Sequence, residues 1–343
     1  MTPWRWVPTL YFAQGIPYVV VMTLSVVMYK NLEVSNTDIA LYTSWLYLPW
    51  VIKPLWSPLV DMLRSKRWWI ATLQLLIGAS LALVALSIPM SQFFQLTLAV
   101  FWLMAFSSAT HDIAADHAAP RSAQFVAEFF AVFAAFFRKK DIAVIPTFLL
   151  LYRLAEAQLL KLAAPFLLDS RSVGGLGLST QQLGVVYGTI GVAALTVGGI
   201  LGGIYISRVG LKRALWPLLL AMHVPNLAYV ALAVWLPQSL WLVGGAIAVE
   251  QFGYGFGFTA FMVYMLMVAS QDAEHRTAHY AICTGFMALG MMLPGMAAGW
   301  LQAQLGYTHF FIWVCIATLP SFAATALLKI DPAFGRRDEV AVR

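Results

Sequence analysis

The sequence predicts an all-α protein, a polytopic bundle of about ten membrane-spanning helices. Hydrophobic residues make up 61% of the 343 positions and charged residues only 10%, whereas about 25% of the residues in a soluble domain are charged. The mean hydropathy is +0.78. Apolar stretches of roughly 20 residues, the length that a helix needs to cross a bilayer, recur along the whole chain.

Each predicted span is an apolar stretch that ends at charged or turn-forming residues. A shorter apolar segment, 124–137, carries Glu128 and ends in Arg138-Lys139-Lys140. This pattern favours an amphipathic helix on the cytoplasmic surface over a further span. The ten predicted spans are residues 6–29, 39–60, 68–90, 93–110, 142–167, 183–206, 214–236, 240–268, 278–301 and 310–328.

The distribution of Lys and Arg predicts the orientation in the membrane. Ten spans place both termini on one side, and the other side then carries only Lys30 and Arg171. Because loops rich in Lys and Arg remain in the cytoplasm, both termini are predicted to be cytoplasmic. The basic residues on that side are Arg5, Arg64, Lys66, Arg67, Arg121, Arg138, Lys139, Lys140, Arg208, Lys212, Arg213, Arg276, Lys329, Arg336, Arg337 and Arg343.

Charge and cysteine content exclude several other classes of protein. The net charge is +6, but the basic residues form short clusters between apolar runs, as in cytoplasmic loops, so no nucleic-acid partner is expected. Cys283 and Cys315 each lie inside an apolar run, which argues against a disulfide framework or a Cys-based metal site. We expect no metal, no cofactor and no enzymatic activity.

Two loops repeat one pattern. Residues 57–67, after the second span, and 203–213, after the sixth, align so that small residues and a Lys-Arg pair coincide. Both resemble the major facilitator signature Gly-x-x-x-Asp-Arg-x-Gly-x-Arg-Arg, of which the first copy keeps Asp61 and the second keeps Arg208 and Gly210. A generic basic loop on the cytoplasmic side is the alternative.

The positions of the two loops predict unequal halves. In the facilitator pattern the loop follows the second span of each half, so four spans fall in the first half here and six in the second. We expect a reduced N-terminal bundle over 1–117, a cytoplasmic linker with the amphipathic helix over 118–141, a six-helix bundle over 142–330 and a cytoplasmic tail over 331–343.

Five stretches resemble the muropeptide permease (AmpG-like) family, namely YFAQGIP (11–17), KPLWSPLVD (53–61), SATHDIAAD (108–116), YRLAEAQ (152–158) and EQFGYG (250–255). The resemblance extends over nearly the whole chain. It implies a proton-coupled importer of peptidoglycan fragments, anhydromuropeptides, in the bacterial inner membrane. Members of that family have twelve spans, so the resemblance also implies that two helices are absent here after SATHDIAAD.

Charged and amide side chains inside the predicted spans are the candidate site residues, because a charge in a bilayer is costly and usually faces a polar cavity. Arg153 and Glu156 are three residues apart and can pair on one helix face, with a purely structural ion pair as the alternative. Glu156 and Glu250 are the predicted proton carriers. Lys53 either faces the cavity or extends to the cytoplasmic interface. The predicted substrate-binding residues are Gln14, Lys53, Arg153, Gln158, Gln251 and Tyr254.

A second group of charged residues lies at the predicted cytoplasmic ends of spans. Asp112 and Asp116 are four residues apart and share a helix face, where they can brace a gate or relay protons. His111 and Asp116 also match the His-x4-Asp pattern of acyltransferases, although no second acyl-binding motif follows. The predicted gate residues are Asp61, Arg64, Arg67, Asp112, Asp116, Arg208 and Arg213.

The predicted function is alternating-access transport, in which two helix bundles rock around a midplane cavity. The expected partners are a small sugar-peptide, protons and the lipid bilayer, and a monomer is expected. Three alternatives remain: a facilitator of another solute such as a sugar or drug, a shortened membrane protein that does not transport, and a membrane-embedded acyltransferase.

Overall fold

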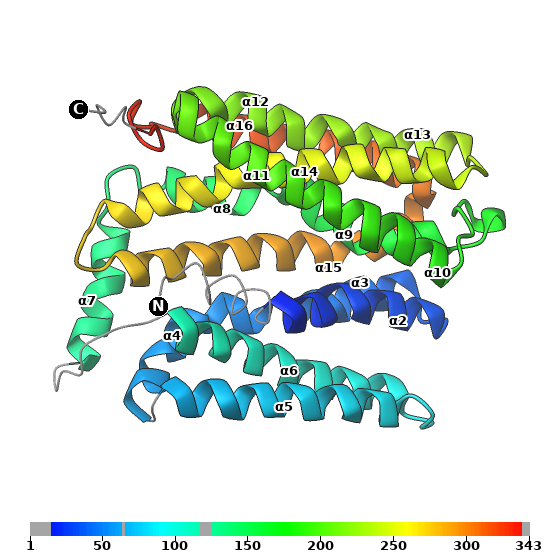
Figure 1. Ribbon diagram of the computed structural model, residues 1–343, viewed down its shortest axis with the longest axis horizontal. Coiled ribbons are helices and arrows are strands. Elements are labelled where there is room, and N and C mark those ends of the chain that lie inside the picture. The colour runs from blue at the N-terminus through cyan, green and yellow to red at the C-terminus, as the bar shows by residue number, and fades with distance from the viewer. Residues whose placement is uncertain (1–14, 64–65, 117–124, 338–343) are drawn as a thin grey trace, which may run out of the picture.

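A computed structural model (Figure 1) describes residues 15–63, 66–116 and 125–337. Every regular element within these ranges is a helix, which confirms the predicted all-α membrane bundle. The long helices run side by side along the longest axis of the molecule, and the turns between them gather at its two ends (Figure 1).

The described parts of the first four predicted spans are mostly helical, and two of these spans are irregular. Residues 15–19 are helical and continue through a π-helical turn into α2. The second span is divided at Leu46 and Tyr47 into α3 and α4. The elements of this half are η2 (Val20–Leu24), α2 (Ser25–Asn31), α3 (Asn36–Trp45), α4 (Leu48–Leu63), α5 (Lys66–Ser87) and α6 (Phe93–Asp116).

The remaining chain forms one short transverse helix followed by the second half of the bundle. The transverse helix is α7 (Phe125–Phe137). The later elements are α8 (Val144–Leu151), α9 (Leu154–Leu168), η3 (Arg171–Val173), α10 (Thr180–Leu183), η4 (Gly184–Gly191), α11 (Val192–Val209), α12 (Leu211–His223), η5 (Val224–Asn226), α13 (Leu227–Trp235), α14 (Leu240–Ser270), α15 (Arg276–Ile316) and α16 (Leu319–Ala326).

Local sequence explains where several of these helices begin or break. The Ser35 side chain accepts a hydrogen bond from the Asp38 backbone N–H and caps the start of α3, as serine commonly does. Pro225 lies at the start of η5, between α12 and α13, where its missing N–H interrupts the helical hydrogen-bond ladder. Gly306 interrupts α15 with φ 71° and ψ 169°, a conformation that favours glycine.

Six helical segments in the described ranges are long and apolar enough to cross a membrane. The last of them, Arg276–Ala326, covers the ninth and tenth predicted spans together, because the break at Gly306 lies within it. The first, second and fifth predicted spans are each divided into shorter helices or lie partly outside the described residues. The polytopic bundle is therefore confirmed, while the count of ten spans stays a prediction.

Helix α15 lies in the middle of the bundle, between α3 and α4 on one side and α9 on the other (Figure 1). Its contact with α3 depends on Gly299, because a Cβ at this position would lie 2.1 Å from the carbonyl oxygen of Asn36. One buried hydrophobic cluster includes Tyr29 and Ile39 from the first half and Phe166 from the second. The core is thus continuous between the two parts of the chain that we expect to move against each other.

Helix α7 crosses one end of the bundle, transverse to the long helices (Figure 1). Phe136 is fully buried and packs on His279 and Phe286 of α15, with ring centroids 5.5 and 6.4 Å away. Phe130 and Phe137 are exposed. The helix therefore has both buried and exposed phenylalanines, and its position in a membrane interface stays a prediction.

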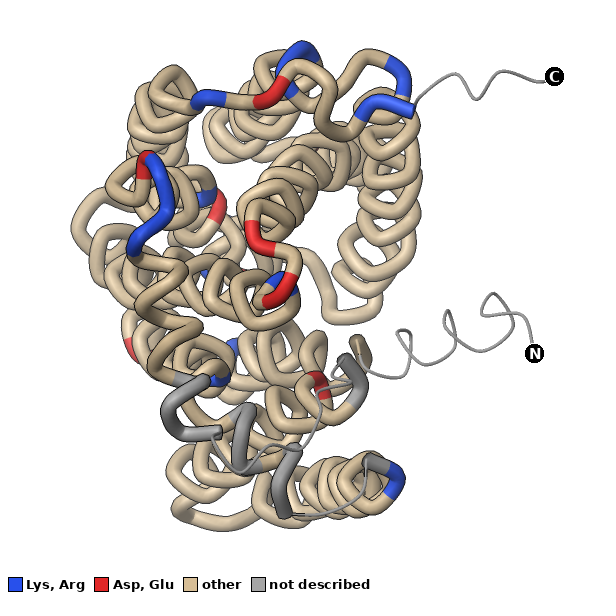
Figure 2. The backbone as a smooth tube through the Cα atoms, turned by 90° about the vertical axis from the view of Figure 1, so that its left-hand side faces the viewer, with Lys and Arg blue, Asp and Glu red and all other residues tan. Residues whose placement is uncertain are grey.

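The two ends of the bundle differ in charge. Figure 2 views the end at which α7 lies, where several Lys and Arg residues gather in the loops. We name this the basic end. The helix bounds place these described cations in its loops and helix ends: Arg67, Arg138, Lys139, Lys140, Arg208, Lys212, Arg213, Arg276, Lys329, Arg336 and Arg337. The opposite end carries Lys30 and Arg171.

Candidate functional site

A cavity of about 540 Å³ lies at the centre of the bundle. Helices from both halves line it, and most of its wall is aromatic or apolar. It extends to Thr277 in the first turn of α15, so it reaches toward the basic end. Three charged side chains line it, Lys53, Asp112 and Arg153. A largely apolar pocket with a few polar groups is the usual form of a small-molecule site.

Arg153 enters this cavity from a break between two helices. Helix α8 ends at Leu151 and α9 begins at Leu154, and Arg153 has φ −110° and ψ 19°. Its guanidinium donates a hydrogen bond to the Tyr254 hydroxyl, and Cζ lies 4.7 Å from the centroid of the Phe258 ring. A cation over an aromatic face is stabilised by the ring quadrupole. The buried Arg153 charge is therefore held by aromatic groups of α14.

The expected ion pair between Arg153 and Glu156 does not form among the described residues. The i,i+3 argument assumed a continuous helix, whereas Arg153 is the non-helical N-cap of α9, so the spacing rule does not apply to this pair. Both carboxyl oxygens of Glu156 and the Arg153 Nε atom are buried without a hydrogen-bond partner in the described chain. The two groups still interact electrostatically. The predicted pairing on one helix face is therefore wrong.

Glu156 and Glu250 form a buried pair of carboxyl groups beside the cavity. Neither lines the cavity itself, and both side chains are essentially fully buried. Their charges interact with each other, and the Gln251 amide donates a 2.9 Å hydrogen bond to Glu250 Oε2. Glu250 lies four residues before Tyr254 on α14, so the two share a helix face. Tyr254, which does line the cavity, thus connects Arg153 to the helix that carries one of the two predicted proton carriers.

Lys53 and Asp112 form the second charged group in the cavity. Their Nζ and Oδ2 atoms are 3.8 Å apart, and the Trp50 indole donates a 3.0 Å hydrogen bond to the same Asp112 oxygen. Lys53 is buried and lines the cavity instead of extending to the interface. Asp112, a predicted gate residue, lies in the cavity wall and pairs with a predicted substrate-binding residue.

The two predicted amide ligands that the structure describes, Gln158 and Gln251, do not line the cavity. Gln158 accepts a 2.8 Å hydrogen bond from the Trp313 indole and donates to the Leu154 carbonyl, so it connects α9 to α15. Gln251 is bonded to Glu250. Gln14 lies outside the described residues. Of the predicted substrate-binding residues, the described cavity brings together Lys53, Arg153 and Tyr254.

The predicted gate residues other than Asp112 are described only in part. Arg67, Arg208 and Arg213 are exposed at the basic end. Arg64 lies outside the described residues, as do the side chains of Asp61 and Asp116. A gate at this end stays a prediction.

Sequence reasoning gave no role to Lys161, although it is a lysine in the middle of a predicted span. Its Nζ atom donates a 2.9 Å hydrogen bond to Thr43 and lies 5.2 Å from the centroid of the Tyr47 ring. The side chain is buried. Lys161 therefore links α9 to the first half of the bundle directly behind Tyr47, a residue of the cavity wall.

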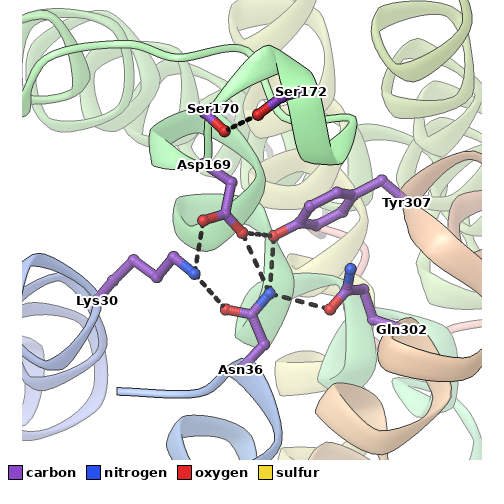
Figure 3. Close-up of polar contacts among 7 residues, drawn as sticks. All are labelled: Lys30, Asn36, Asp169, Ser170, Ser172, Gln302 and Tyr307. Carbon is purple, nitrogen blue, oxygen red and sulfur yellow. Dashed lines mark hydrogen bonds and ion pairs between the residues drawn. The ribbon is translucent and has the colours of Figure 1, made fainter. Parts of the chain in front are cut away.

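A polar cluster at the opposite end of the bundle was also not predicted (Figure 3). We name it the Asp169 network, and it consists of Lys30, Asn36, Asp169, Gln302 and Tyr307. Lys30 Nζ lies 2.6 Å from Asp169 Oδ1, and the Tyr307 hydroxyl donates a 2.5 Å hydrogen bond to Asp169 Oδ2. Asn36 accepts from Lys30 at 2.8 Å and donates to Gln302 at 2.9 Å. The network joins the α2–α3 turn to the end of α9 and to α15.

Within 15–63, 66–116 and 125–337, no three His, Cys, Asp or Glu side chains are placed to hold a metal ion. Cys283 is buried and Cys315 is half-buried, and both are free thiols. The site that remains is therefore a charged aromatic cavity with two carboxyl groups beside it, inside an apolar helix bundle.

This fold and this site define a membrane helix bundle with a largely apolar cavity that contains three charged side chains. Comparisons with known proteins match the chain to permeases and transporters. Residues 14–129 match the BT1 family. The chain is 27% identical over 185 residues to the anhydromuropeptide permease of Escherichia coli, a match that covers 54% of this chain and 36% of that protein. It is 27% identical over 195 residues to a putative transporter, AmpG 2, of Rickettsia typhi, covering 57% of this chain and 46% of that one.

These matches confirm the resemblance to the AmpG-like family that the sequence motifs indicated, and they support that family assignment. The chain matches less than half of the length of these relatives. The relatives are named as a permease and a putative transporter.

Proposed function

We propose that this protein is a proton-coupled importer of anhydromuropeptides in the bacterial inner membrane that works by alternating access. One observation carries the proposal: the Arg153–Tyr254 contact forms part of the cavity wall, and two buried carboxyl groups that interact electrostatically lie beside it. Uncompensated ionisable groups are rare in spans and usually mark substrate or proton pathways. The names of the relatives supply the substrate class.

The orientation follows from the positive-inside rule. With the basic end in the cytoplasm, both termini are cytoplasmic and the cavity reaches toward the cytoplasm near Thr277. The Asp169 network then joins the helices at the periplasmic end. We assign this arrangement to an inward-facing state, so the network must break before the cavity can open to the periplasm.

The cavity wall suits an anionic sugar-peptide. Arg153 and Lys53 supply cations for carboxylates, because charge-assisted hydrogen bonds are stronger than neutral ones. Tyr18 and Trp50 lie in the same wall with ring centroids 5.4 Å apart and present aromatic surface to the apolar faces of sugar rings.

Arg153 provides a physical coupling between substrate and proton. Its guanidinium interacts electrostatically with Glu156. When a substrate carboxylate pairs with the Arg153 guanidinium, this positive charge stabilises the ionised Glu156 less. The ionised form of Glu156 then becomes unfavourable in its low-dielectric site. Proton uptake by the Glu156–Glu250 pair then removes a costly buried charge. Binding of an anionic solute and of a proton therefore favour each other.

Uptake of labelled anhydromuropeptide into vesicles with an imposed proton gradient tests the proposal. The unmodified protein is expected to accumulate the label, and a protonophore is expected to abolish accumulation. Glu156→Gln and Glu250→Gln are each expected to reduce gradient-driven accumulation at least tenfold while exchange of labelled for unlabelled solute continues, because a neutral amide imitates the protonated acid.

The matched control is Arg336→Gln, which removes an exposed charge far from the cavity and is expected to leave uptake unchanged. Accumulation that survives both glutamate substitutions would overturn the assigned proton carriers. Uptake of a neutral sugar or a drug in place of the muropeptide would overturn the substrate, and the absence of any uptake in folded protein would support the non-transporting alternative.

A further inference from the structure

A second and larger recess lies at the basic end, apart from the central cavity. It is a groove of about 940 Å³ between the loop after α7, the loop joining α14 to α15, and the segment after α16. Figure 2 looks onto this end of the bundle, where charged segments face the viewer. Arg138, Lys139 and Lys140 line the groove from the first loop, and Lys329 lines it from the last segment.

The acidic residues of the groove already have partners. Asp141 pairs with Lys329, with Oδ1 and Nζ 3.0 Å apart. Asp272 lies 3.0 Å from the His275 ring, measured from Oδ2 to Nδ1, and also accepts backbone hydrogen bonds from Glu274 and His275. Asp331 accepts a 2.9 Å hydrogen bond from the backbone of Ala333. These carboxylates are therefore largely occupied by their own contacts.

The three consecutive cations are not compensated in this way. Among the described residues, the side chains of Arg138, Lys139 and Lys140 form no ion pair of 4 Å or less and no hydrogen bond. Arg138 and Lys140 are exposed, whereas Lys139 is half-buried. Partial burial lowers the pKa of Lys139, despite the nearby charge of Asp272. An ammonium that loses water without gaining a partner is unfavourable, so an anion in the groove would relieve this cost.

Helix α7 places the groove at the membrane surface. Its last turn leads directly into Arg138, and Phe136 fixes the helix to α15. Phe137, directly before Arg138, is 51% exposed, and Phe130, earlier on the same helix, is 67% exposed; neither lines the groove itself, but both add apolar surface to the helix that leads into it. An anionic lipid contacts cations with its phosphate and apolar surface with its acyl chains, so a site that combines the two suits such a lipid.

We propose that this groove binds the phosphate group of an anionic phospholipid through Arg138, Lys139 and Lys140. The ligand chemistry is a phosphate ester at the membrane surface, with acyl chains lying against α7. The same phosphate chemistry could be supplied by free phosphate, and the experiment below separates the two sources. The inference is independent of the transported solute.

The experiment measures binding of phosphatidylglycerol to the full-length protein in detergent, with phosphatidylcholine, inorganic phosphate and soluble glycerophosphoglycerol as parallel probes. The unmodified protein is expected to bind phosphatidylglycerol in preference to phosphatidylcholine. A basic residue near an anionic headgroup contributes about a fivefold change in affinity, so Lys139→Gln is expected to weaken binding about fivefold and the triple Gln variant at 138–140 at least about tenfold.

The matched control is a variant with Lys212, Arg336 and Arg337 all changed to Gln, which removes three exposed charges from the same end without touching the groove lining. It is expected to change the affinity less than twofold. An equal loss in both triple variants would overturn the site in favour of a general surface potential, as would equal binding of phosphatidylcholine.

Free phosphate is the occupant if inorganic phosphate or glycerophosphoglycerol displaces phosphatidylglycerol at matched concentration, and this result would overturn the lipid assignment. Because the triple variant could fail to fold, its thermal unfolding is measured in parallel, and Lys139→Arg serves as a charge-conserving variant. Lys139→Arg is expected to retain binding within about twofold, and a loss as large as that of Lys139→Gln would contradict the electrostatic role.

Discussion

The central cavity and the Asp169 network are both polar clusters within an apolar bundle, but they satisfy their polar groups differently. In the network, no described side chain is left buried without a hydrogen-bond partner. Beside the cavity, Arg153 Nε and both Glu156 oxygens lack one. Buried polar groups are normally hydrogen-bonded, so exceptions need an explanation. The network thus holds helices together through satisfied hydrogen bonds, whereas the groups beside the cavity have hydrogen-bonding capacity that the proposed ligand and proton would use.

The largest effect on stability is expected for a substitution at Gly299, where α15 packs closely against the backbone of Asn36, a residue of the Asp169 network. In Gly299→Ala the added methyl group would lie 2.1 Å from the Asn36 carbonyl oxygen. Because this neighbour is backbone and cannot rotate away, the substitution is expected to destabilise the protein by about 3 kcal/mol, the upper part of the range for overpacking. Thermal unfolding in detergent measures the loss. Gly245→Ala is the control, since a Cβ there meets nothing within 4 Å, and equal stability of the two variants would contradict the close contact.

The second largest effect is expected on solute affinity, when the positive charge of Arg153 in the cavity is removed. Arg153→Gln removes the guanidinium that contacts Tyr254 and Phe258. If this charge binds a substrate carboxylate, affinity should fall roughly 10- to 100-fold, the equivalent of one charged hydrogen bond. Binding of labelled anhydromuropeptide to purified protein provides the measurement. Unchanged affinity in a folded variant would assign Arg153 a purely structural role, and Arg153→Lys separates charge from the planar shape of the guanidinium.

The third prediction tests whether the Asp169 network keeps its end of the bundle closed without affecting solute binding in the cavity. Asp169→Asn weakens the ion pair with Lys30 and the hydrogen bond from Tyr307. Since this pair is partly exposed, its loss should cost about 1 kcal/mol and shift the balance between closed and open states about fivefold. Spin labels at Ser91 and Val173, introduced after replacement of both native cysteines, would report a longer distance across this end.

Solute affinity in the inward-facing state should remain unchanged in Asp169→Asn, because the network does not line the cavity. Glu33→Gln is the control, since it removes an exposed carboxylate from the same end without entering the network. A distance distribution identical to that of the unmodified protein would show that the network does not govern closure.

The smallest effect is expected on the unfolding temperature, for the surface pair of Asp272 and His275 at the basic end. Hydrogen bonds from the His275 ring and backbone lower the pKa of Asp272 below its ordinary value of 3.8. A depressed pKa in the folded state contributes stability that is complete above the unfolded value and is lost as pH falls through the folded value. Asp272→Asn should therefore unfold at a slightly lower temperature than the unmodified protein at pH 7, and the difference should shrink as the pH is lowered below the unfolded value of 3.8. A difference that does not change as the pH falls below 3.8 would assign the effect to packing.

The sequence predicted those features that depend on local composition. Apolar stretches predicted the bundle, and residues with charge inside spans predicted Lys53 and Arg153 as cavity residues, where the structure places them. The pairing of Arg153 with Glu156 failed because the helix breaks at Arg153, and neither glycine nor proline occurs between Leu151 and Leu154 to signal the break.

Other features depend on contacts between distant positions. The Asp169 network brings together residues near positions 30, 169 and 305, and single-sequence patterns carry no information on such pairing. Gln158 illustrates the same limit, because its contact with Trp313 removes it from the set of cavity ligands. The close approach at Gly299 could have been suspected only from the presence of a glycine inside a long apolar helix.

Helix α15 lines the cavity between Thr277 and Met291 and reaches the Asp169 network at Gln302; its backbone stays helical up to Gly306, with Pro294 inside it. In the proposed transport cycle, a small tilt of this helix about its middle would move its two ends in opposite directions. Opening the proposed periplasmic end would then narrow the cytoplasmic mouth near Thr277 in the same movement, so this one helix would keep both sides from being open at once.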